Sequence, residues 1–276
     1  MLLRVLCGFR FYDAAIDMRL RSIFLLAFAG PSAAQEITVA AAADLRPAFE
    51  EIIASFQQSH SGAVVKVAYG SSGNFFQQIQ SGAPFDMFFS ANEEYPKKLE
   101  SAGLTVPGSY HQYARGKIVL LVSSGSKLDI KQGLKLLLDA NVKKIAIADP
   151  SHAPYGQAAL AALKTEKMYD QVSAKLVTGE NISQAASFVL SGAADVGIAS
   201  LSLALAPATR GQVRYWEIPP SDYPPIQQAC VIIKASKNQQ LAMQFQTYFR
   251  SKEVSGILER YGFEVPAGSK IGQPSN

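Results

Sequence analysis

The sequence has no continuous apolar run of the roughly 18 to 20 residues that a membrane-spanning helix requires. Only two cysteines and three histidines occur in its 276 residues, and neither the H-E-x-x-H motif of zinc proteases nor the G-x-S-x-G elbow of serine hydrolases is present. The net charge of +4 is small and scattered, so nucleic acid is not the favoured partner. These absences argue against a membrane-spanning protein, a metalloprotease, a typical serine hydrolase and a nucleic-acid-binding protein.

Residues 1–34 have the composition of a secretory leader. From Met18 the chain reads MRLRSIFLLAFAGPSAAQE, in which two arginines precede a short apolar run and a small-x-small ending. These are the three parts of a signal peptide, which predicts cleavage after Ala34 and a soluble periplasmic protein that begins at Gln35. Residues 1–17 fit no signal pattern, so Met18 is an alternative start of translation. A buried N-terminal helix is the competing interpretation.

Short apolar strands alternate with amphipathic helices after Gln35. The candidate strands span residues 37–42, 64–69, 86–91, 117–123, 144–149, 174–178, 195–200, 213–218 and 228–234. Between the first two strands, Leu45, Phe49 and Ile52 recur at helical spacing. Strands separated by helical segments predict an α/β fold, in which mainly parallel sheets are flanked by helices.

Four strand-to-helix junctions carry unusual residues. They are AAAADLRPAFEEI with Asp44, YGSSGNFF with Ser71 and Ser72, DPSHAPYGQAAL with Tyr155, and TGENISQAASF with Asn181 and Ile182. We expect Asp44, one of the two serines and Asn181 to cap the helices that follow them. Because ligands of open α/β sheets bind beyond the carboxyl ends of the strands, we expect the four junctions to converge on one ligand.

The stretch GSSGNFF, residues 70–76, indicates what that ligand is. A loop that tightens into a helix presents free backbone N–H groups and hydroxyls, which suit an anion. No lysine follows, as a nucleotide-binding P-loop would require. The sequence therefore favours a small oxyanion that is held by neutral hydrogen-bond donors.

Other functional classes have little support in the sequence. A hydrolase could use Ser72 as nucleophile and His152 as base, but no acidic residue is evidently placed to orient the histidine. Cys230 lies in the apolar stretch ACVIIK, which predicts a buried strand residue and not a nucleophile. A ligand-sensing regulatory domain is opposed by the signal peptide and by the lack of DNA-binding helices.

Six motifs connect the sequence to a known family. ITVAAAADL, YGSSGNFFQQIQSGAPFDMFFSAN, YARGKIVLLV, IADPSHAPYGQAAL, GENISQA and SKEVSGILERYGF occur in this order between residues 37 and 263. In these motifs the chain resembles the periplasmic molybdate-binding proteins of ABC transporters. The resemblance implies a two-lobed type II periplasmic-binding-protein fold, with residues 35–122 and 222–276 in one lobe and residues 123–221 in the other.

The same resemblance implies a function and its partners. The protein would be a monomeric receptor without enzymatic activity or a cofactor, which binds molybdate or tungstate between the lobes. It would deliver the anion to an inner-membrane ABC permease. A sulfate-type receptor on the same fold is the alternative within this class.

The resemblance also implies the residues that contact the ligand. Ser72 would donate its hydroxyl and its backbone N–H, and Ile182 would donate its backbone N–H. Tyr155 would donate its backbone N–H, with its phenol as an optional further contact. Ala43 and Asp44 occupy a position where many relatives have serine, threonine or asparagine. Molybdenum would be held only as the oxyanion, through these same residues.

Two positions depart from the pattern of the family. Ser200 stands where some relatives have a binding tyrosine, for which Tyr155 is a possible substitute. Asp44 would place a carboxylate beside a dianion, which is unfavourable at low dielectric. As a helix cap, Asp44 would turn its side chain away and offer only its backbone N–H. In the alternative, found in archaeal relatives, the carboxylate contacts the metal, and Glu180 is the only candidate for the second acid that this requires.

Neutral donors also predict selectivity. A dianion without protons can accept hydrogen bonds from every side, whereas a protonated phosphate needs an acceptor that a pocket of N–H groups does not offer. We therefore expect phosphate to be excluded by chemistry. Sulfate has to be excluded by size, which the sequence does not reveal.

Overall fold

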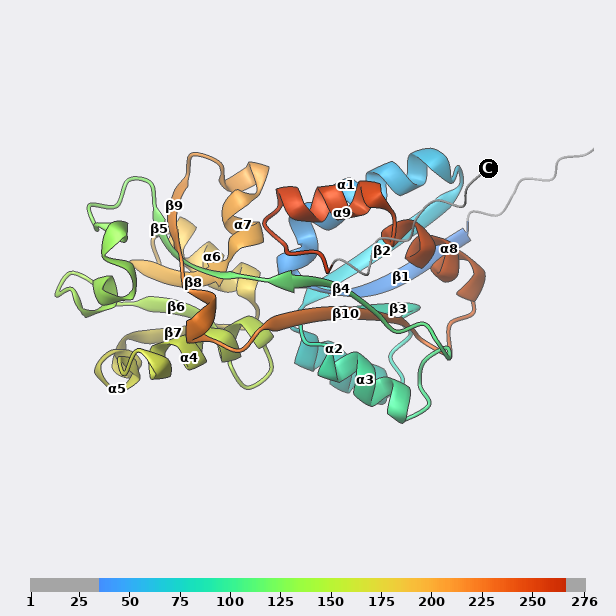
Figure 1. The fold of residues 1–276 in the computed structure, drawn as a ribbon, viewed down its shortest axis with the longest axis horizontal. Coiled ribbons are helices and arrows are strands. Elements are labelled where there is room, and N and C mark those ends of the chain that lie inside the picture. The colour runs from blue at the N-terminus through green and yellow to red at the C-terminus, as the bar shows by residue number, and fades with distance from the viewer. Residues whose placement is uncertain (1–34, 267–276) are drawn as a thin grey trace, which may run out of the picture. The chain divides into compact units, whose positions relative to one another are not determined.

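The computed structural model describes residues 35–266. The predicted signal peptide, residues 1–34 with its alternative start at Met18, lies outside the described residues, as do residues 267–276. Within the described part of the chain the strands form two five-stranded sheets (Figure 1). Each sheet is the centre of a lobe, and we call these the first and the second lobe in chain order.

The first sheet contains both parallel and antiparallel pairs. In spatial order its strands are β2 (Ala63–Gly70), β1 (Gln35–Ala42), β3 (Met87–Ser90), β10 (Ile226–Ile232) and β4 (His111–Gly116). β1 runs parallel to β2 and β3, and Ala42 lies opposite Gly70 where β1 and β2 end. β10 runs antiparallel to β3 and β4. This register brings the carboxyl ends of β1 and β2 to one edge of the sheet.

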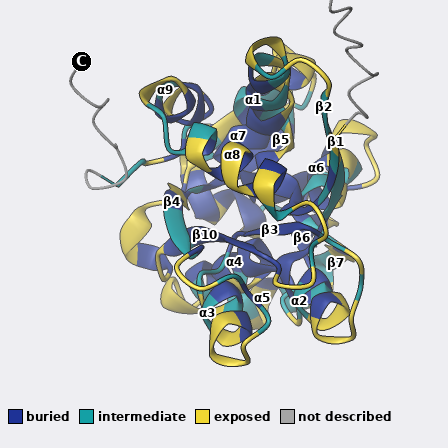
Figure 2. Ribbon diagram, turned by 90° about the vertical axis from the view of Figure 1, so that its right-hand side faces the viewer, coloured by how far each residue is buried: buried dark blue, intermediate teal, exposed yellow. Residues whose placement is uncertain are grey.

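Helices cover both faces of the first sheet. They are α1 (Arg46–Ser59), α2 (Ser72–Gln80), α3 (Glu94–Ser101), α8 (Gln239–Phe249) and α9 (Lys252–Arg260). On one face α1, α8 and α9 pack on the strands in a cluster that contains Phe49, Phe245 and Phe249. On the other face α2 and α3 contribute Phe75 and Leu99 to a smaller cluster. Figure 2 shows β3 and β10 buried between helices whose outer turns are exposed.

The second sheet has the same pattern of strand directions. In spatial order its strands are β7 (Leu176–Gly179), β6 (Ile145–Ala148), β8 (Val196–Ser200), β5 (Ile118–Ser123) and β9 (Val213–Glu217). β6 runs parallel to β7 and β8, whereas β5 runs antiparallel to β8 and β9. The carboxyl ends of β6 and β7 therefore also share an edge.

The second lobe has its own set of helices. The α-helices are α4 (Pro154–Thr165), α5 (Tyr169–Val172), α6 (Ile182–Leu190) and α7 (Leu201–Leu205). The 3-10 segments of the described chain are η1 (Ala43–Leu45), η2 (Ile130–Leu138), η3 (Ser173–Lys175), η4 (Pro207–Thr209) and η5 (Pro220–Asp222). The core of this lobe is one continuous cluster, and it includes Ala42, Ala43 and Ala91 from the first lobe. Small side chains thus allow the two lobes to approach closely.

The chain crosses between the lobes twice. β4 leads into β5 at Lys117, and β9 leads into β10 through residues 218–225. The crossings touch each other, because the backbone N–H of Ile118 donates a hydrogen bond to the Tyr223 hydroxyl at 3.3 Å. The predicted boundary between residues 122 and 123 falls inside β5, whereas β5 pairs only within the second sheet. The apolar pattern of residues 117–123 predicts a strand but does not indicate which of the two sheets the strand joins.

The predicted α/β class with flanking helices is confirmed, and strands are present at all nine predicted positions. Strand direction was predicted less well, since four of the eight pairings are antiparallel. Strand β4 was not predicted, because HQYARG is mostly polar and buries only Tyr113, Ala114 and Gly116. Among residues 35–266 no helix has the length and apolar character needed to cross a bilayer.

Candidate functional site

The four predicted junctions converge on one small cavity between the lobes. Its volume is about 10 Å³, close to the space of one water molecule, so the lobes are tightly closed around it. The residues that line it are Ala42, Ala43, Asp44, Gly70, Ser71, Ser72, Ala91, Ala153, Pro154, Tyr155, Asn181 and Ile182. All five predicted ligand contacts are in this set, namely Ala43, Asp44, Ser72, Tyr155 and Ile182. Their roles toward a ligand stay predictions.

Strand order explains why these distant segments meet. The first two junctions follow β1 and β2, which are parallel neighbours in the first sheet. The last two follow β6 and β7, which are parallel neighbours in the second sheet. Parallel neighbours end at the same edge, and the two edges face each other across the cavity. The helices α2, α4 and α6 therefore begin at its wall, and their first-turn N–H groups have no acceptor within their own helix.

Helix α2 contributes a serine hydroxyl whose proton is free. Ser71 is the N-cap, and its Oγ accepts a hydrogen bond from Asn74 N–H at 3.4 Å. Ser72 is the first helical residue, and its Oγ accepts a hydrogen bond from Ala91 N–H at 2.9 Å. Because this bond uses a lone pair of the Ser72 oxygen, the O–H can still donate into the cavity.

Helices α4 and α6 present backbone amides. Pro154 opens α4, where its missing N–H costs nothing, and Tyr155 follows it. Asn181 caps α6, since its Oδ1 accepts a hydrogen bond from Gln184 N–H at 3.1 Å, and Ile182 is the first helical residue as predicted. The Gln184 side chain accepts from Glu180 N–H at 2.6 Å, one residue before the position of a regular capping box. Glu180 itself is exposed and does not line the cavity.

The predicted capping role of Asp44 is wrong. Helix α1 begins at Arg46 without any side-chain cap, and its first turn contains Pro47, which lacks an N–H to be capped. Asp44 is fully buried in η1, and its carboxylate points to the second lobe and to β10 instead. Its Oδ2 accepts hydrogen bonds from the Tyr155 hydroxyl at 2.8 Å and from Gln228 Nε2 at 2.7 Å.

The other oxygen of Asp44 is unsatisfied. Asp44 Oδ1 is buried and has no hydrogen-bond partner among the described residues. Burial raises the pKa of this carboxyl from 3.8 to about 6, although the hydrogen bonds from Gln228 and Tyr155, and the backbone N–H of Asp44 itself, act in the opposite direction. The cavity is therefore lined by one acidic group and by no lysine or arginine. This corrects the expectation of a pocket built from neutral donors alone.

The carboxylate belongs to a buried network that joins the lobes. The Tyr113 hydroxyl donates to Gln228 Oε1 at 2.8 Å, and Gln228 Nε2 also donates to the Tyr155 hydroxyl at 3.0 Å. Burial and the Asp44 carboxylate hold the pKa of Tyr155 well above its ordinary value, so the phenol stays a donor. Tyr155 was predicted as an optional ligand contact through its phenol, but this group is engaged with Asp44.

Further hydrogen bonds link the two lobes around the cavity. The Ser183 hydroxyl donates to Ala43 O at 3.1 Å, and the Ser202 hydroxyl donates to Asp44 O at 2.7 Å. Gly73 N–H donates to His152 O at 2.9 Å. A Cβ at Gly73 would lie 2.6 Å from this carbonyl oxygen, so only glycine allows the backbones to approach so closely.

The Ser72–His152 pair required by the hydrolase hypothesis is not formed. His152 Nδ1 lies 2.8 Å from the hydroxyl of Ser71, the neighbouring residue. Asp149 Oδ2 lies 3.6 Å from His152 Nε2, which is too long for a hydrogen bond. Ser71 is occupied as the cap of α2, and Ser72 bonds to the backbone of Ala91.

Ser200 does not line the cavity. Its Oγ caps α7 and lies 3.0 Å from the Ser202 hydroxyl. Sequence reasoning missed two buried residues, Gln228, which donates to Asp44, and Tyr113, which donates to Gln228. The signal for Gln228 was its position in an apolar strand, where a polar side chain needs a partner.

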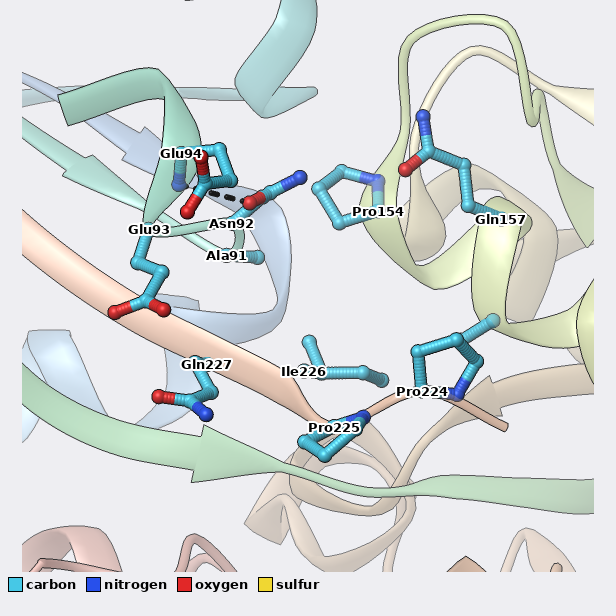
Figure 3. A pocket seen from close by; sticks show the side chains of 11 residues that line it. Ala91, Asn92, Glu93, Glu94, Pro154, Gln157, Pro224, Pro225, Ile226 and Gln227 are labelled. Carbon is cyan, nitrogen blue, oxygen red and sulfur yellow. Dashed lines mark hydrogen bonds between the residues drawn. The ribbon is translucent and has the colours of Figure 1, made fainter. Parts of the chain in front are cut away.

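A second, larger hollow lies beside the cavity and has a different character. Its volume is about 280 Å³, and it shares Ala91 and Pro154 with the smaller cavity. Glu93 and Glu94 contribute carboxylates to its wall, and the Asn92 side chain extends toward Pro154 (Figure 3). Its acidic groups disfavour an anion there.

Within residues 35–266 no cluster of three or more His, Cys, Asp or Glu side chains could hold a metal ion.

Comparisons with known proteins agree with this architecture. A family model described as bacterial extracellular solute-binding protein matches residues 37–264. The chain is 36% identical to the molybdate-binding protein ModA of Rhodobacter capsulatus over 239 residues, which cover 87% of this chain and 92% of the relative. The solved periplasmic molybdate-binding protein of Azotobacter vinelandii is similar with a TM-score of 0.78 and 33% identity, covering 83% of this chain and 99% of that chain.

A more distant structure shows how widely the fold occurs. The sulfate-binding protein SubI from Mycobacterium tuberculosis matches with a TM-score of 0.69 and 18% identity, covering 85% of this chain and 88% of that chain. At this identity the likeness concerns the fold alone. Together with the closer matches, it confirms the predicted two-lobed type II fold.

The buried carboxyl predicts how stability depends on pH. Since the pKa of Asp44 is raised in the folded protein, the folded state holds this proton more tightly than the unfolded state does. The protonated carboxyl therefore makes its full contribution to the free energy of unfolding below about pH 4. This contribution is lost as the pH rises through about 6. Asp44→Asn should raise the free energy of unfolding of the ligand-free protein at pH 8 by up to about 3 kcal/mol, and leave it unchanged near pH 4.

Urea unfolding of both proteins at the two pH values measures this difference. Asp222→Asn is the matched control, because Asp222 is also largely buried but lies outside the cavity. A loss of stability in Asp44→Asn at pH 8 would show that the charged carboxylate stabilises the fold, contrary to this account.

Proposed function

Since the chain belongs to the family of bacterial extracellular solute-binding proteins, we propose that it is an exported receptor for molybdate, which also accepts tungstate. In this role it captures the oxyanion in the cavity between the lobes and delivers it to an ABC importer in the inner membrane. It performs no catalysis and needs no cofactor. The relatives named for molybdate binding support the choice of ligand.

One observation carries the proposal. Segments that lie up to 140 residues apart in sequence, from Ala42 to Ile182, line the same cavity and direct the first turns of three helices toward it. Helix N-termini bind anions through their free N–H groups and the positive end of the helix dipole. No basic side chain lines the cavity, which distinguishes it from a nucleotide site. A compact oxyanion fits this set of donors.

Three of the five predicted contacts have a definite donor group to offer. Ser72 offers its hydroxyl proton and its backbone N–H, while Tyr155 and Ile182 offer first-turn N–H groups. Ala43 is nearly fully buried and lets the backbone approach the ligand closely. Hydrogen bonds to a charged acceptor contribute about 1.5 to 3 kcal/mol each, so several of them can offset the desolvation of the anion. An affinity between roughly micromolar and nanomolar follows.

Export and delivery belong to the same proposal. The leader-like residues 1–34 and the family membership support a periplasmic location. A receptor that feeds an importer has to close on its ligand and open again, and the two adjacent crossings at Lys117 and at residues 218–225 can act as the hinge. We propose that the protein acts as a monomer, since one chain supplies the whole cavity.

Calorimetric titration of the purified protein tests the ligand. Molybdate and tungstate should bind with micromolar or better affinity, whereas sulfate and phosphate should bind at least a hundredfold more weakly. The same titrations in 0.5 M sodium chloride serve as a control for non-specific anion binding. Sulfate binding as tight as molybdate binding would replace this proposal with a sulfate receptor.

Ser72→Ala tests the hydroxyl contact. The substitution removes one donor to the anion and leaves Ala91 N–H without its acceptor, so molybdate binding should weaken by about 1 to 3 kcal/mol. Ser101→Ala, at an exposed position of α3, is the matched control and should bind like the parent. If Ser72→Ala and the parent bind molybdate with equal affinity, the Ser72 hydroxyl does not contact the ligand and has only a structural role.

Gly73→Ala tests the closure of the lobes. The added methyl group would lie 2.6 Å from His152 O in the other lobe, so it opposes closure without disturbing either lobe alone. Alanine also favours the helix, and the unfolding temperature should therefore not fall. We expect molybdate affinity to drop at least tenfold. Gly256→Ala in α9, where a Cβ meets nothing within 4 Å, is the control and should leave the affinity unchanged.

A further inference from the structure

The unsatisfied oxygen of Asp44 is the starting point. Asp44 is fully buried, lines the cavity and has no partner for Oδ1 among the described residues. Its Oδ2, in contrast, accepts two hydrogen bonds that fix the carboxyl group from two sides. A buried acceptor that is left unpaired costs about 1 to 3 kcal/mol, and more if it is charged. Because Asp44 lines the cavity, a ligand bound there can supply the donor that the described residues do not.

A dianion cannot be that donor by itself. Every oxygen of a fully deprotonated tetrahedral anion is an acceptor, and so is a carboxylate oxygen. Two such oxygens repel each other, and the low dielectric of a buried site makes this repulsion strong. One proton between them removes the conflict and creates a charge-assisted hydrogen bond.

We propose that the cavity binds its anion together with one proton, which lies between Asp44 Oδ1 and an oxygen of the anion. The proposal rests on the proposed function of the cavity as an oxyanion site. The proton comes from water and returns to water on release, so no bond other than this O–H bond changes. Asp44 thereby sets the charge and the protonation of the complex that the receptor accepts.

Among the side chains of the buried network, only Asp44 can take up the proton, because the others do not titrate in the neutral range. Tyr155 from α4 and Tyr113 from β4 are the titratable side chains of the network, and burial keeps the pKa of both far above the neutral range. Gln228 from β10 does not titrate. The raised pKa of Asp44, about 6 before any anion is present, has the right sign, and a neighbouring dianion raises it further.

Arg46 and His152 are charged or titratable side chains outside the residues that line the cavity. Arg46 on α1 is exposed, and its guanidinium lies 4.3 Å from the centroid of the Tyr69 ring, outside the residues that line the cavity. His152, in the loop before α4, reaches the cavity wall only through the Ser71 hydroxyl. Because this imidazole is itself titratable, the experiment has to separate it from Asp44.

This proposal changes the expected selectivity. A pocket of N–H donors alone would reject any oxyanion that carries a proton, because it offers no acceptor. Asp44 Oδ1 is such an acceptor, so chemistry alone no longer excludes protonated oxyanions. Discrimination then depends on the size of the cavity and on the number of donors that surround the anion.

Proton uptake can be measured directly. Molybdate is titrated into the purified protein at pH 8 in two buffers with different enthalpies of protonation. The parent should take up close to one proton per anion, and Asp44→Asn close to none. The dissociation constant of the parent should rise about tenfold per pH unit above pH 7, the slope that one coupled proton produces. Asp44→Asn should change less than threefold between pH 6.5 and 8.5 and bind at least tenfold tighter than the parent at pH 8.5.

Two control variants locate the proton. Asp86→Asn, at a buried carboxyl outside both the cavity and the hinge, and His152→Gln should keep both the proton uptake and the pH slope of the parent. If the slope disappears in His152→Gln but persists in Asp44→Asn, the proton belongs to the histidine and the proposal is wrong. Tight molybdate binding without proton uptake also refutes it, while the proposed function stands. Absence of molybdate binding at every pH would instead remove both.

Discussion

The buried carboxyl of Asp44 is the interaction on which the arrangement of the site depends. It belongs to the first lobe, yet one of its oxygens accepts hydrogen bonds from Tyr155 in the second lobe and from Gln228 in the strand that returns from it. Taking this group out of water is unfavourable, and the raised pKa reports that cost. The donors that reduce the cost are supplied only where the lobes meet, which ties the electrostatics of the site to the closure of the cleft.

The close approach of the lobes relies on small residues at a few positions. Gly73 allows its N–H to reach the carbonyl of His152, and a Cβ at Gly116 would collide with the Tyr155 hydroxyl. Ala42, Ala43 and Ala91 extend the core of the second lobe across the cleft. A longer side chain at any of these positions would hold the lobes apart and prevent the cleft from closing.

Local patterns were sufficient for much of the fold and for the position of the site. The spacing of Phe49 and Ile52 placed α1, and apolar runs placed nine of the ten strands. The cap predicted at Asn181, and the one predicted at either Ser71 or Ser72, marked two helix starts correctly, because a cap is an interaction within a few residues of sequence. Strand β4 was missed because its partner β10 lies more than a hundred residues away, and its pattern alone is weak.

The sequence by itself determined the class of the fold, the junctions that form the cavity and the resemblance to oxyanion receptors. These features depend on residue type and on near neighbours in the chain. Only the tertiary structure decided where the Asp44 side chain points. A capping aspartate and an aspartate that bridges two lobes look alike in sequence, since the difference lies in Tyr155 and Gln228, which are 111 and 184 residues away. The pKa of the Asp44 carboxyl is set mainly by its burial, and burial depends on the complete tertiary structure.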